Sequence, residues 1–228
     1  MRRFRIKICG ITRLADALCA AEAGVDALGF IFHEKSPRNI APEAAREIIA
    51  ALPPFVAAIG LFVNADIDQV VTTIHGCGLH YAQLHGEEAP SYCQHLRSLA
   101  PTCGLIKALR LGGPQDKKRD AGLSPPNYTP HIRAFLLDTY SPKAHGGTGT
   151  SFDWQLIHTL GLSKPFLLAG GLHPGNVQTA LQVSNAYAVD ANSGLEDAPG
   201  MKNHTLIQQF VRNVRAYEQD CYLASRSV

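Results

Sequence analysis

Short apolar runs alternate with helix-forming stretches along the chain, and this alternation constrains the fold more than any other feature. Eight apolar runs are predicted to be strands: Arg5–Cys9, Ala27–Phe32, Val56–Val63, Tyr81–Leu84, Leu105–Leu109, Ala134–Asp138, Phe166–Ala169 and Ala186–Val189. Seven stretches are predicted to be helices: Leu14–Ala23, Pro42–Leu52, Ile67–His75, Ala89–Leu99, Trp154–Leu160, Gly175–Val183 and Lys202–Glu218. A further short helix is expected near Gln115–Asp120. Eight strands alternating with helices predict an α/β fold, the (β/α)₈ TIM barrel.

The length supports this prediction. The chain has 228 residues, which suits one barrel domain, and no linker or low-complexity segment divides it. A chain of this size buries about 70–75% of its unfolded surface, so it needs no metal or disulfide to fold. We therefore expect a single domain over residues 1–228, with a doubly wound sheet carrying a cap as the alternative.

Charge and cysteine content exclude several classes of protein. The net charge of +2 indicates no strong attraction to nucleic acid or membranes, and no run approaches the length of a membrane span. The six cysteines form no CxxC pair and no Cys/His cluster with zinc-finger spacing, which predicts free thiols in a reducing compartment and no metal site. The start MRRFRIKICG lacks the apolar core of a signal peptide, so we expect a cytoplasmic protein.

Alternation within the strands identifies side chains that face the inside of the barrel. In RFRIKIC the apolar residues 4, 6 and 8 share one face, whereas Arg5, Lys7 and Cys9 share the other. Polar groups that face the lumen near the C-terminal end of a strand belong to the active-site end of a TIM barrel. Four residues lie at such positions: Cys9, His85, Asp138 and Asp190.

Each of the polar candidates has a structural and a functional interpretation. Cys9 is either a small core residue or a reactive thiol. Asp138, after four apolar residues, either caps the next loop or acts as a general acid. Arg38 follows a stiff Ser-Pro pair and is either solvated or directed at a carboxylate.

Glycine-rich loops follow the last two strands. Gly170–Gly171 comes after the seventh strand and Ser193–Gly194 after the eighth. Bare backbone N–H groups at these two positions of a barrel are typical of a phosphate site. A third glycine segment, Gly146–Gly149, is either a mobile loop over the site or a surface connection.

A series of motifs runs over nearly the whole chain: KICGIT, GFIF followed by SPR, GLFVN, QLHG, LLDT, GGTG followed by FDW, LAGGL followed by PGNV, and VDANSGLE followed by PGMK. In their order and spacing, these motifs resemble the phosphoribosylanthranilate isomerase family. No one motif would suffice, but so many at matching spacing are highly specific.

The resemblance implies an aldose–ketose isomerase of tryptophan biosynthesis. Its reaction would be the Amadori rearrangement of N-(5-phosphoribosyl)anthranilate to 1-(2-carboxyphenylamino)-1-deoxyribulose 5-phosphate, by general acid–base catalysis and without a cofactor. By resemblance, Cys9 is the base and Asp138 the acid, Arg38 contacts the anthranilate carboxylate, and Asp190 contacts sugar hydroxyls. The remaining implied site residues are His85, which lines the site, and Gly170, Gly171, Ser193 and Gly194, which hold the phosphate. Lys7 is a further site candidate that could lower the pKa of Cys9.

The sequence also departs from the family pattern. Thr150 stands where a lysine is usual, Asn203 where an aspartate is usual, and Ala191-Asn192 where valine-serine is common. Two other functions stay open: the related isomerase of histidine biosynthesis, whose class uses a carboxylate base, and a non-catalytic phosphosugar-binding barrel. The partner is expected to be a small phosphosugar, and the oligomeric state stays open between monomer and homodimer.

Overall fold

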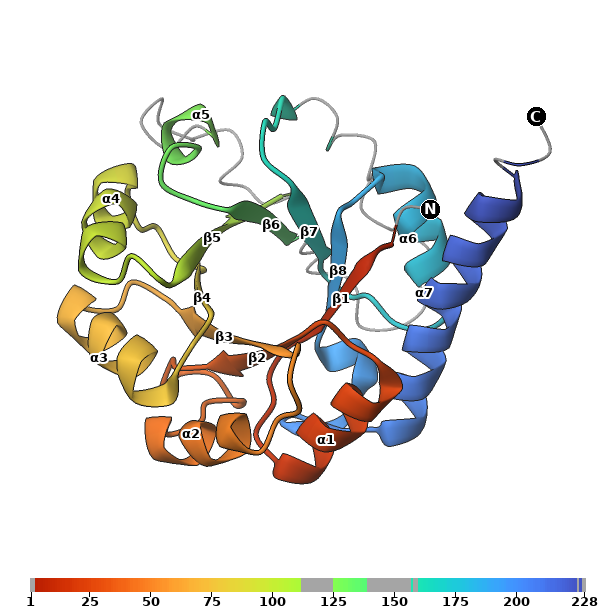
Figure 1. Ribbon diagram of the computed structural model, residues 1–228, viewed down its shortest axis with the longest axis horizontal. Helices are drawn as coiled ribbons and strands as arrows, with labels where there is room; N and C mark the ends of the chain where they lie inside the picture. The colour runs from red at the N-terminus through yellow and green to blue at the C-terminus, as the bar shows by residue number, and fades with distance from the viewer. Residues whose placement is uncertain (1–2, 112–124, 139–156, 158–159, 225, 227–228) are drawn as a thin grey trace.

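The barrel closes through eight parallel strands that pair in chain order, the first with the last (Figure 1). A computed structural model describes residues 3–111, 125–138, 157, 160–224 and 226. The strands are β1 (Arg5–Ile8), β2 (Ala27–Ile31), β3 (Ala57–Phe62), β4 (Tyr81–Leu84), β5 (Gly104–Arg110), β6 (Ala134–Asp138), β7 (Phe166–Ala169) and β8 (Ala188–Ala191). This order confirms the predicted (β/α)₈ barrel, rather than an open doubly wound sheet.

Helices surround the strands on the outside of the barrel (Figure 1). They are α1 (Leu14–Ala23), α2 (Pro42–Ala50), α3 (Ile67–Cys77), α4 (Pro90–Leu99), α5 (Pro125–Tyr128), α6 (Val177–Ser184) and α7 (His204–Ala224). Local signals set several of these ends. The side chain of Asp66 caps α3 by accepting from the N–H of Asp68, and Gly78 ends the helix in the left-handed conformation.

Several predicted boundaries toward the C-terminal end of the chain are wrong. α6 begins at Val177 rather than at Gly175, and α7 ends at Ala224 rather than at Glu218. β8 lies two residues later than predicted, because its four residues pair in register with β1, where Lys7 is opposite Asp190. The last helix begins at His204 rather than at Lys202. Lys202 instead belongs to β10 (Met201–Lys202), which pairs with β9 (Glu196–Ala198) in a small antiparallel sheet.

The residue Asn203 explains where α7 starts. Its side-chain oxygen accepts a hydrogen bond of 3.0 Å from the N–H of Leu206, as an N-cap does. Its amide nitrogen donates to Asp197 at 2.7 Å. The asparagine at this position, a departure from the family pattern, therefore performs the capping that an aspartate would also perform.

Three sequence predictions lie outside the described residues. These are the short helix Gln115–Asp120, the glycine segment Gly146–Gly149 and Thr150; of the predicted helix Trp154–Leu160 only Ile157 and Leu160 are described. The short α5 was not predicted. Among the described helices, none combines the length and the apolar character that crossing a membrane requires.

The barrel interior separates into an apolar layer and a more polar layer. Small and branched side chains fill the lumen: Ile59, Ile106, Ala108, Ala134, Leu136, Leu167, Ala169 and Ala188. Phe4, Ile6 and Ile8 of the first strand region pack outward in the main core between strands and helices, as their alternation predicts. Cys9 packs with Ile31 and Leu61 in a small cluster of its own. The chemistry-bearing side chains therefore lie at the end of the barrel where the strands terminate, here called the mouth.

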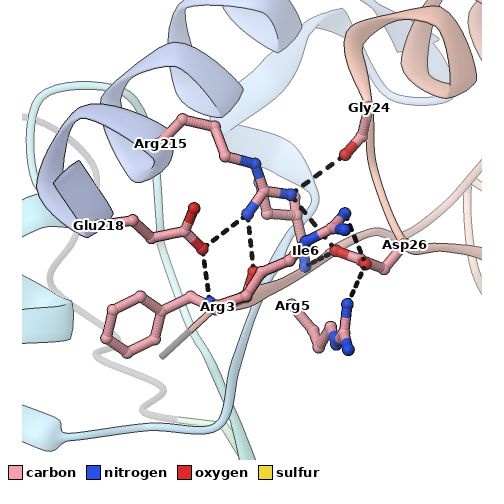
Figure 2. Close-up of polar contacts among 8 residues, drawn as sticks. Arg3, Arg5, Ile6, Gly24, Asp26, Arg215 and Glu218 are labelled. Carbon is pink, nitrogen blue, oxygen red and sulfur yellow. Dashed lines mark hydrogen bonds and ion pairs between the residues drawn. The ribbon is translucent and has the colours of Figure 1, made fainter. Parts of the chain in front are cut away.

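An ion-pair network fastens the opposite end of the barrel (Figure 2). Glu218 of α7 accepts from the N–H of Phe4 at 2.5 Å and from Arg215 at 2.7 Å. Asp26, just before β2, accepts from the N–H of Ile6 at 2.9 Å and from Arg5 at 3.0 Å. These contacts tie the first strand to the last helix, far from the mouth.

Candidate active site

Cys9 lies directly after β1, with its thiol turned into the mouth of the barrel. Its N–H donates to the carbonyl of Ala191 at 2.9 Å, which fixes the backbone, and only 3% of the residue is exposed. Gly29 of β2 makes room for the side chain: a Cβ at that position would lie 2.7 Å from the Cys9 sulfur and 3.2 Å from the Lys7 Cε atom. The strand pattern therefore places this thiol in a tight lumen pocket that depends on a neighbouring glycine.

Lys7 and Asp190 form a buried ion pair beside this thiol. The Lys7 ammonium lies 2.5 Å from the Asp190 carboxylate, and both side chains are almost fully buried. Burial raises the pKa of Cys9 above its ordinary value, and the Asp190 charge adds to this, while Lys7 and Lys202 act in the opposite direction. The charge of Lys7 acts toward a lower pKa of the thiol, but burial outweighs it and the pKa of Cys9 is raised on balance.

Two buried oxygens in the mouth have no hydrogen-bond partner among the described residues. They are Oδ1 of Asp190 and Oε1 of Gln83. Leaving a buried polar atom unpaired costs about 1–3 kcal/mol, so such atoms call for an explanation. The Asp190 oxygen is an acceptor next to Cys9, where a hydroxyl group of a ligand would satisfy it.

Asp138 ends β6 and is linked to β4 through a chain of polar side chains. The Asp138 carboxylate lies 3.3 Å from Nε2 of His85, and Nδ1 of His85 lies 2.9 Å from the Gln83 amide nitrogen. If the amide donates to Nδ1, the proton of a neutral His85 resides on Nε2 and points at Asp138. The side chain of Asp138 is 23% exposed, so it is accessible from the mouth.

Arg38, on the loop after β2, makes a two-pronged ion pair with Glu196 of β9. Its Nε atom donates to the two carboxylate oxygens at 2.9 and 3.0 Å, and its Nη2 atom donates to Oε2 at 2.6 Å. Arg38 and Lys202 together hold the pKa of Glu196 below its ordinary value despite burial. Lys202 is itself buried, which lowers its pKa, and its ammonium lies 2.8 Å from Glu196.

The two glycine loops after β7 and β8 lie against each other. Gly170 and Gly171 both have positive φ, at 98° and 63°. A Cβ at Gly194 would overlap the carbonyl oxygen of Leu172, so only glycine allows this close approach. Ser193 begins a short 3₁₀ turn, η4 (Ser193–Leu195). Backbone from both loops therefore meets at one place on the mouth.

The structure brings most of the predicted residues together at the mouth and adds three that were not predicted. Gln83, Glu196 and Lys202 are buried partners of His85, Arg38 and Asn192. Strand alternation could have identified Gln83, which has the same parity as His85 in YAQLHG. Within the described parts of the chain, no group of three or more His, Cys, Asp or Glu side chains is arranged to hold a metal ion.

Comparison with known proteins decides which family has this arrangement. The model of the N-(5'phosphoribosyl)anthranilate (PRA) isomerase family matches residues 6–213. The chain belongs to this family. A phosphoribosylanthranilate isomerase from Geobacter sp. (strain M21) is 49% identical over 211 residues, which cover 92% of this chain and 98% of the relative. One from Pseudomonas fluorescens is 46% identical over 215 residues, covering 94% and 97%.

Solved phosphoribosylanthranilate isomerases share the fold. The enzyme from Thermotoga maritima has a TM-score of 0.81 at 41% identity, over 93% of this chain and 99% of that one. Another structure, of a phosphoribosylanthranilate isomerase in complex with reduced 1-(o-carboxyphenylamino)-1-deoxyribulose 5-phosphate, has a TM-score of 0.79 at 39% identity over the same shares. A further one contains monomers generated from the dimeric Thermotoga maritima enzyme; it has a TM-score of 0.78 at 37% identity, again covering 93% and 99%.

Proposed function

We propose that this chain catalyses the Amadori rearrangement of N-(5-phosphoribosyl)anthranilate in tryptophan biosynthesis, with Cys9 as the general base and Asp138 as the general acid. The observation that carries this proposal is the position of the two groups in a member of this family. Cys9 follows β1 and Asp138 ends β6, at the same end of the barrel. An acid and a base can thus act on one substrate held at the mouth.

The acid step opens the sugar ring. Asp138 in its protonated form donates its proton to the furanose ring oxygen, and the C1–O bond breaks as the anilinic nitrogen forms an iminium with C1. The side chain of Asp138 is partly exposed and borders His85, which places it where a ligand can reach it. His85 holds the carboxyl group in place through its ring nitrogen.

The base step moves a proton from carbon. The iminium acidifies the C2 proton of the sugar, and the thiolate of Cys9 removes it to give an enolamine. The enolamine then takes up a proton at C1 and loses the proton of its C2 hydroxyl, which gives the ketone, 1-(2-carboxyphenylamino)-1-deoxyribulose 5-phosphate. The substrate nitrogen serves as the electron sink, so the residues of the chain need only supply and accept protons.

The buried charges around Cys9 fit this role. Lys7 favours the thiolate, and its ammonium is held 2.5 Å from Asp190 so that both charges stay compensated. Asp190 has one carboxylate oxygen without a partner among the described residues, and we assign that oxygen to a hydroxyl group of the sugar. Asp190 would therefore have two roles: one of its carboxylate oxygens positions Lys7, and the other binds the substrate.

Two groups of residues are assigned to the two ends of the substrate, the anthranilate ring and the phosphate. Arg38 would bind the anthranilate carboxylate, since a planar guanidinium suits a carboxylate with two parallel hydrogen bonds. The loops at Gly170–Gly171 and Ser193–Gly194 would hold the phosphate through backbone N–H groups. A phosphosugar bound this way would have its reacting carbons between Cys9 and Asp138.

A fluorescence assay with freshly generated phosphoribosylanthranilate tests the proposed activity. The substrate signal should disappear in proportion to the amount of protein, and the product should match the ketose in mass. The Asp138→Asn variant should be nearly inactive, because an amide cannot protonate the ring oxygen. Binding of the product without turnover of the substrate would instead identify a non-catalytic phosphosugar-binding barrel.

Three further assignments belong to this proposal. We propose that the chain acts as one domain over residues 1–228 and as a monomer or a homodimer, the two states recorded for the Thermotoga maritima relative. Analytical ultracentrifugation distinguishes the two. The cytoplasm is the proposed place of action, because the six free cysteines suit a reducing compartment.

A further inference from the structure

Glu196 occupies only one edge of the Arg38 guanidinium. The group has five N–H donors, one on Nε and two on each Nη atom. Glu196 takes the edge formed by Nε and Nη2. Among the described residues, none accepts a hydrogen bond from Nη1. The end-on edge, formed by Nη1 and the second N–H of Nη2, therefore remains for another acceptor. This edge, too, can bind a carboxylate by two parallel hydrogen bonds.

Glu196 is itself held in place from the other side. The Lys202 ammonium donates to Glu196 at 2.8 Å, to the side chain of Asn192 at 2.8 Å and to the Asn192 carbonyl at 3.2 Å. These three contacts use all three donors of the lysine, whose side chain is fully buried. The N–H of Gly200 adds a contact of 3.3 Å to the same carboxylate. These contacts hold the Glu196 carboxylate in its position beside Arg38.

The charges in this cluster sum to one positive charge. Arg38 and Lys202 are cations and Glu196 is an anion whose pKa is held below its ordinary value. A cluster with this surplus can accept one more carboxylate without leaving a negative charge unpaired. Asn192, one of the departures from the family pattern, completes the cluster by binding Lys202.

We propose that Glu196 is a positioning residue that orients Arg38 for the carboxylate of the anthranilate ring. It fixes the side-on edge of the guanidinium so that the end-on edge faces the substrate. The inference rests on the proposed function, in which Arg38 binds that carboxylate. Without Glu196, the Arg38 side chain would keep its charge but lose its fixed orientation. Its conformational freedom would then be lost only when the ligand binds, which lowers the affinity.

The test compares two ligands by calorimetry: reduced 1-(2-carboxyphenylamino)-1-deoxyribulose 5-phosphate, and its counterpart with a plain phenyl ring. In Glu196→Gln, one carboxylate oxygen is replaced by an amide NH₂ group, which cannot accept a hydrogen bond from Arg38. The two-pronged contact between residues 38 and 196 is then lost. Immobilising one flexible side chain accounts for roughly 3- to 10-fold in affinity. Affinity for the carboxylate ligand should fall by about that factor, while the phenyl ligand binds as before. The KM for substrate should rise in step, with kcat little changed.

Asp16→Asn is the matched control. Asp16 accepts from the N–H of Lys202 at 3.1 Å and lies 2.9 Å from His204, so it anchors the same small sheet without touching Arg38. This variant should lose stability, but the ratio of its affinities for the two ligands should be that of the wild type. An unchanged ratio in Asp16→Asn and a changed one in Glu196→Gln would separate orientation of Arg38 from support of the sheet.

A double-mutant cycle completes the test. In an Arg38→Met background, Glu196→Gln should have no further effect on the ratio of the two affinities. If Arg38→Met alone left the ratio unchanged, the anthranilate assignment of Arg38, and this inference with it, would be wrong. If Arg38→Met changed the ratio but Glu196→Gln did not, or weakened both ligands equally, the proposed function would stand and the role of Glu196 would be structural only.

Discussion

A single methyl group at Gly29 should disable the proposed base while leaving it in the chain. Gly29 lies in the middle of β2, beside the end of β1. A Cβ there would be 2.7 Å from the Cys9 sulfur, 3.1 Å from its Cα atom and 3.2 Å from the Lys7 Cε atom. Non-bonded heavy atoms prefer about 3.5–4.0 Å, so Gly29→Ala must displace the sulfur by about 1 Å.

That displacement sets the expected loss. A misplacement of about 1 Å can reduce a rate roughly 10²-fold, because the reacting atoms no longer meet in the productive geometry. Overpacking a well-packed interior costs about 1–3 kcal/mol of folding free energy. We therefore expect Gly29→Ala to fold, to lose some thermal stability, and to show kcat about 100-fold below wild type. Steady-state kinetics with freshly generated phosphoribosylanthranilate measures the first quantity, and thermal denaturation followed by circular dichroism measures the second.

Gly60→Ala is the matched control for this experiment. A Cβ at Gly60 of β3 would meet Leu79 at 2.5 Å, Phe62 at 3.0 Å and Phe32 at 3.1 Å, on the outer side of the strand and away from Cys9. It should lose stability in a comparable way and keep kcat within a few fold of wild type. If Gly29→Ala kept its kcat while its stability fell like that of Gly60→Ala, the position of the Cys9 sulfur would not limit the reaction and the reasoning would be refuted.

Three further predictions concern pH, phosphate and stability. Because burial raises the pKa of Cys9, kcat/KM should increase with pH on the alkaline side. Asp190→Asn removes a charge that raises this pKa, so the rise in kcat/KM should move to lower pH; a move to higher pH would contradict the assignment of Cys9 as the base. A bulky side chain at Gly171 should raise KM more than it lowers kcat and weaken competition by inorganic phosphate; an unchanged KM would place the phosphate elsewhere. Glu218→Ala removes the carboxylate that accepts from the N–H of Phe4 and from Arg215, and should cost about 1.5–3 kcal/mol, seen as a lower Tm with unchanged kcat. An unaltered Tm would show that these contacts do not stabilise the fold.

The sequence determined the fold well because its signals are local. Alternation in the first strand correctly separated Lys7 and Cys9 from the outward residues, and α1 has the predicted bounds, Leu14–Ala23. The start of α7 was missed because Lys202 pairs with Glu196 and Asp16, contacts that no local pattern reveals. Likewise, the bounds of β8 depend on its register with β1 at the other end of the chain.

In the candidate site, too, positions that follow from local sequence could be predicted, whereas contacts between distant residues could not. The strand ends indicated Cys9 and Asp138 as mouth residues, since position in a barrel strand follows from alternation. What surrounds them could not be predicted. The ion pair of Lys7 with Asp190 joins residues 183 apart in sequence, and the ion pair of Arg38 with Glu196 joins residues 158 apart. Such partners depend on the closed barrel, so they emerge only once the strands are placed.

The most direct test of the account is the activity of Cys9→Ala on freshly generated phosphoribosylanthranilate, with product binding measured on the same sample. A positioned base contributes typically about 10²–10⁴-fold, so kcat/KM should fall by that factor. The variant should fold and bind product almost as the wild type does, because removing one small buried sulfur leaves the glycine loops and Arg38 in place. A variant that kept more than about a tenth of the wild-type kcat/KM would show that Cys9 is not the base.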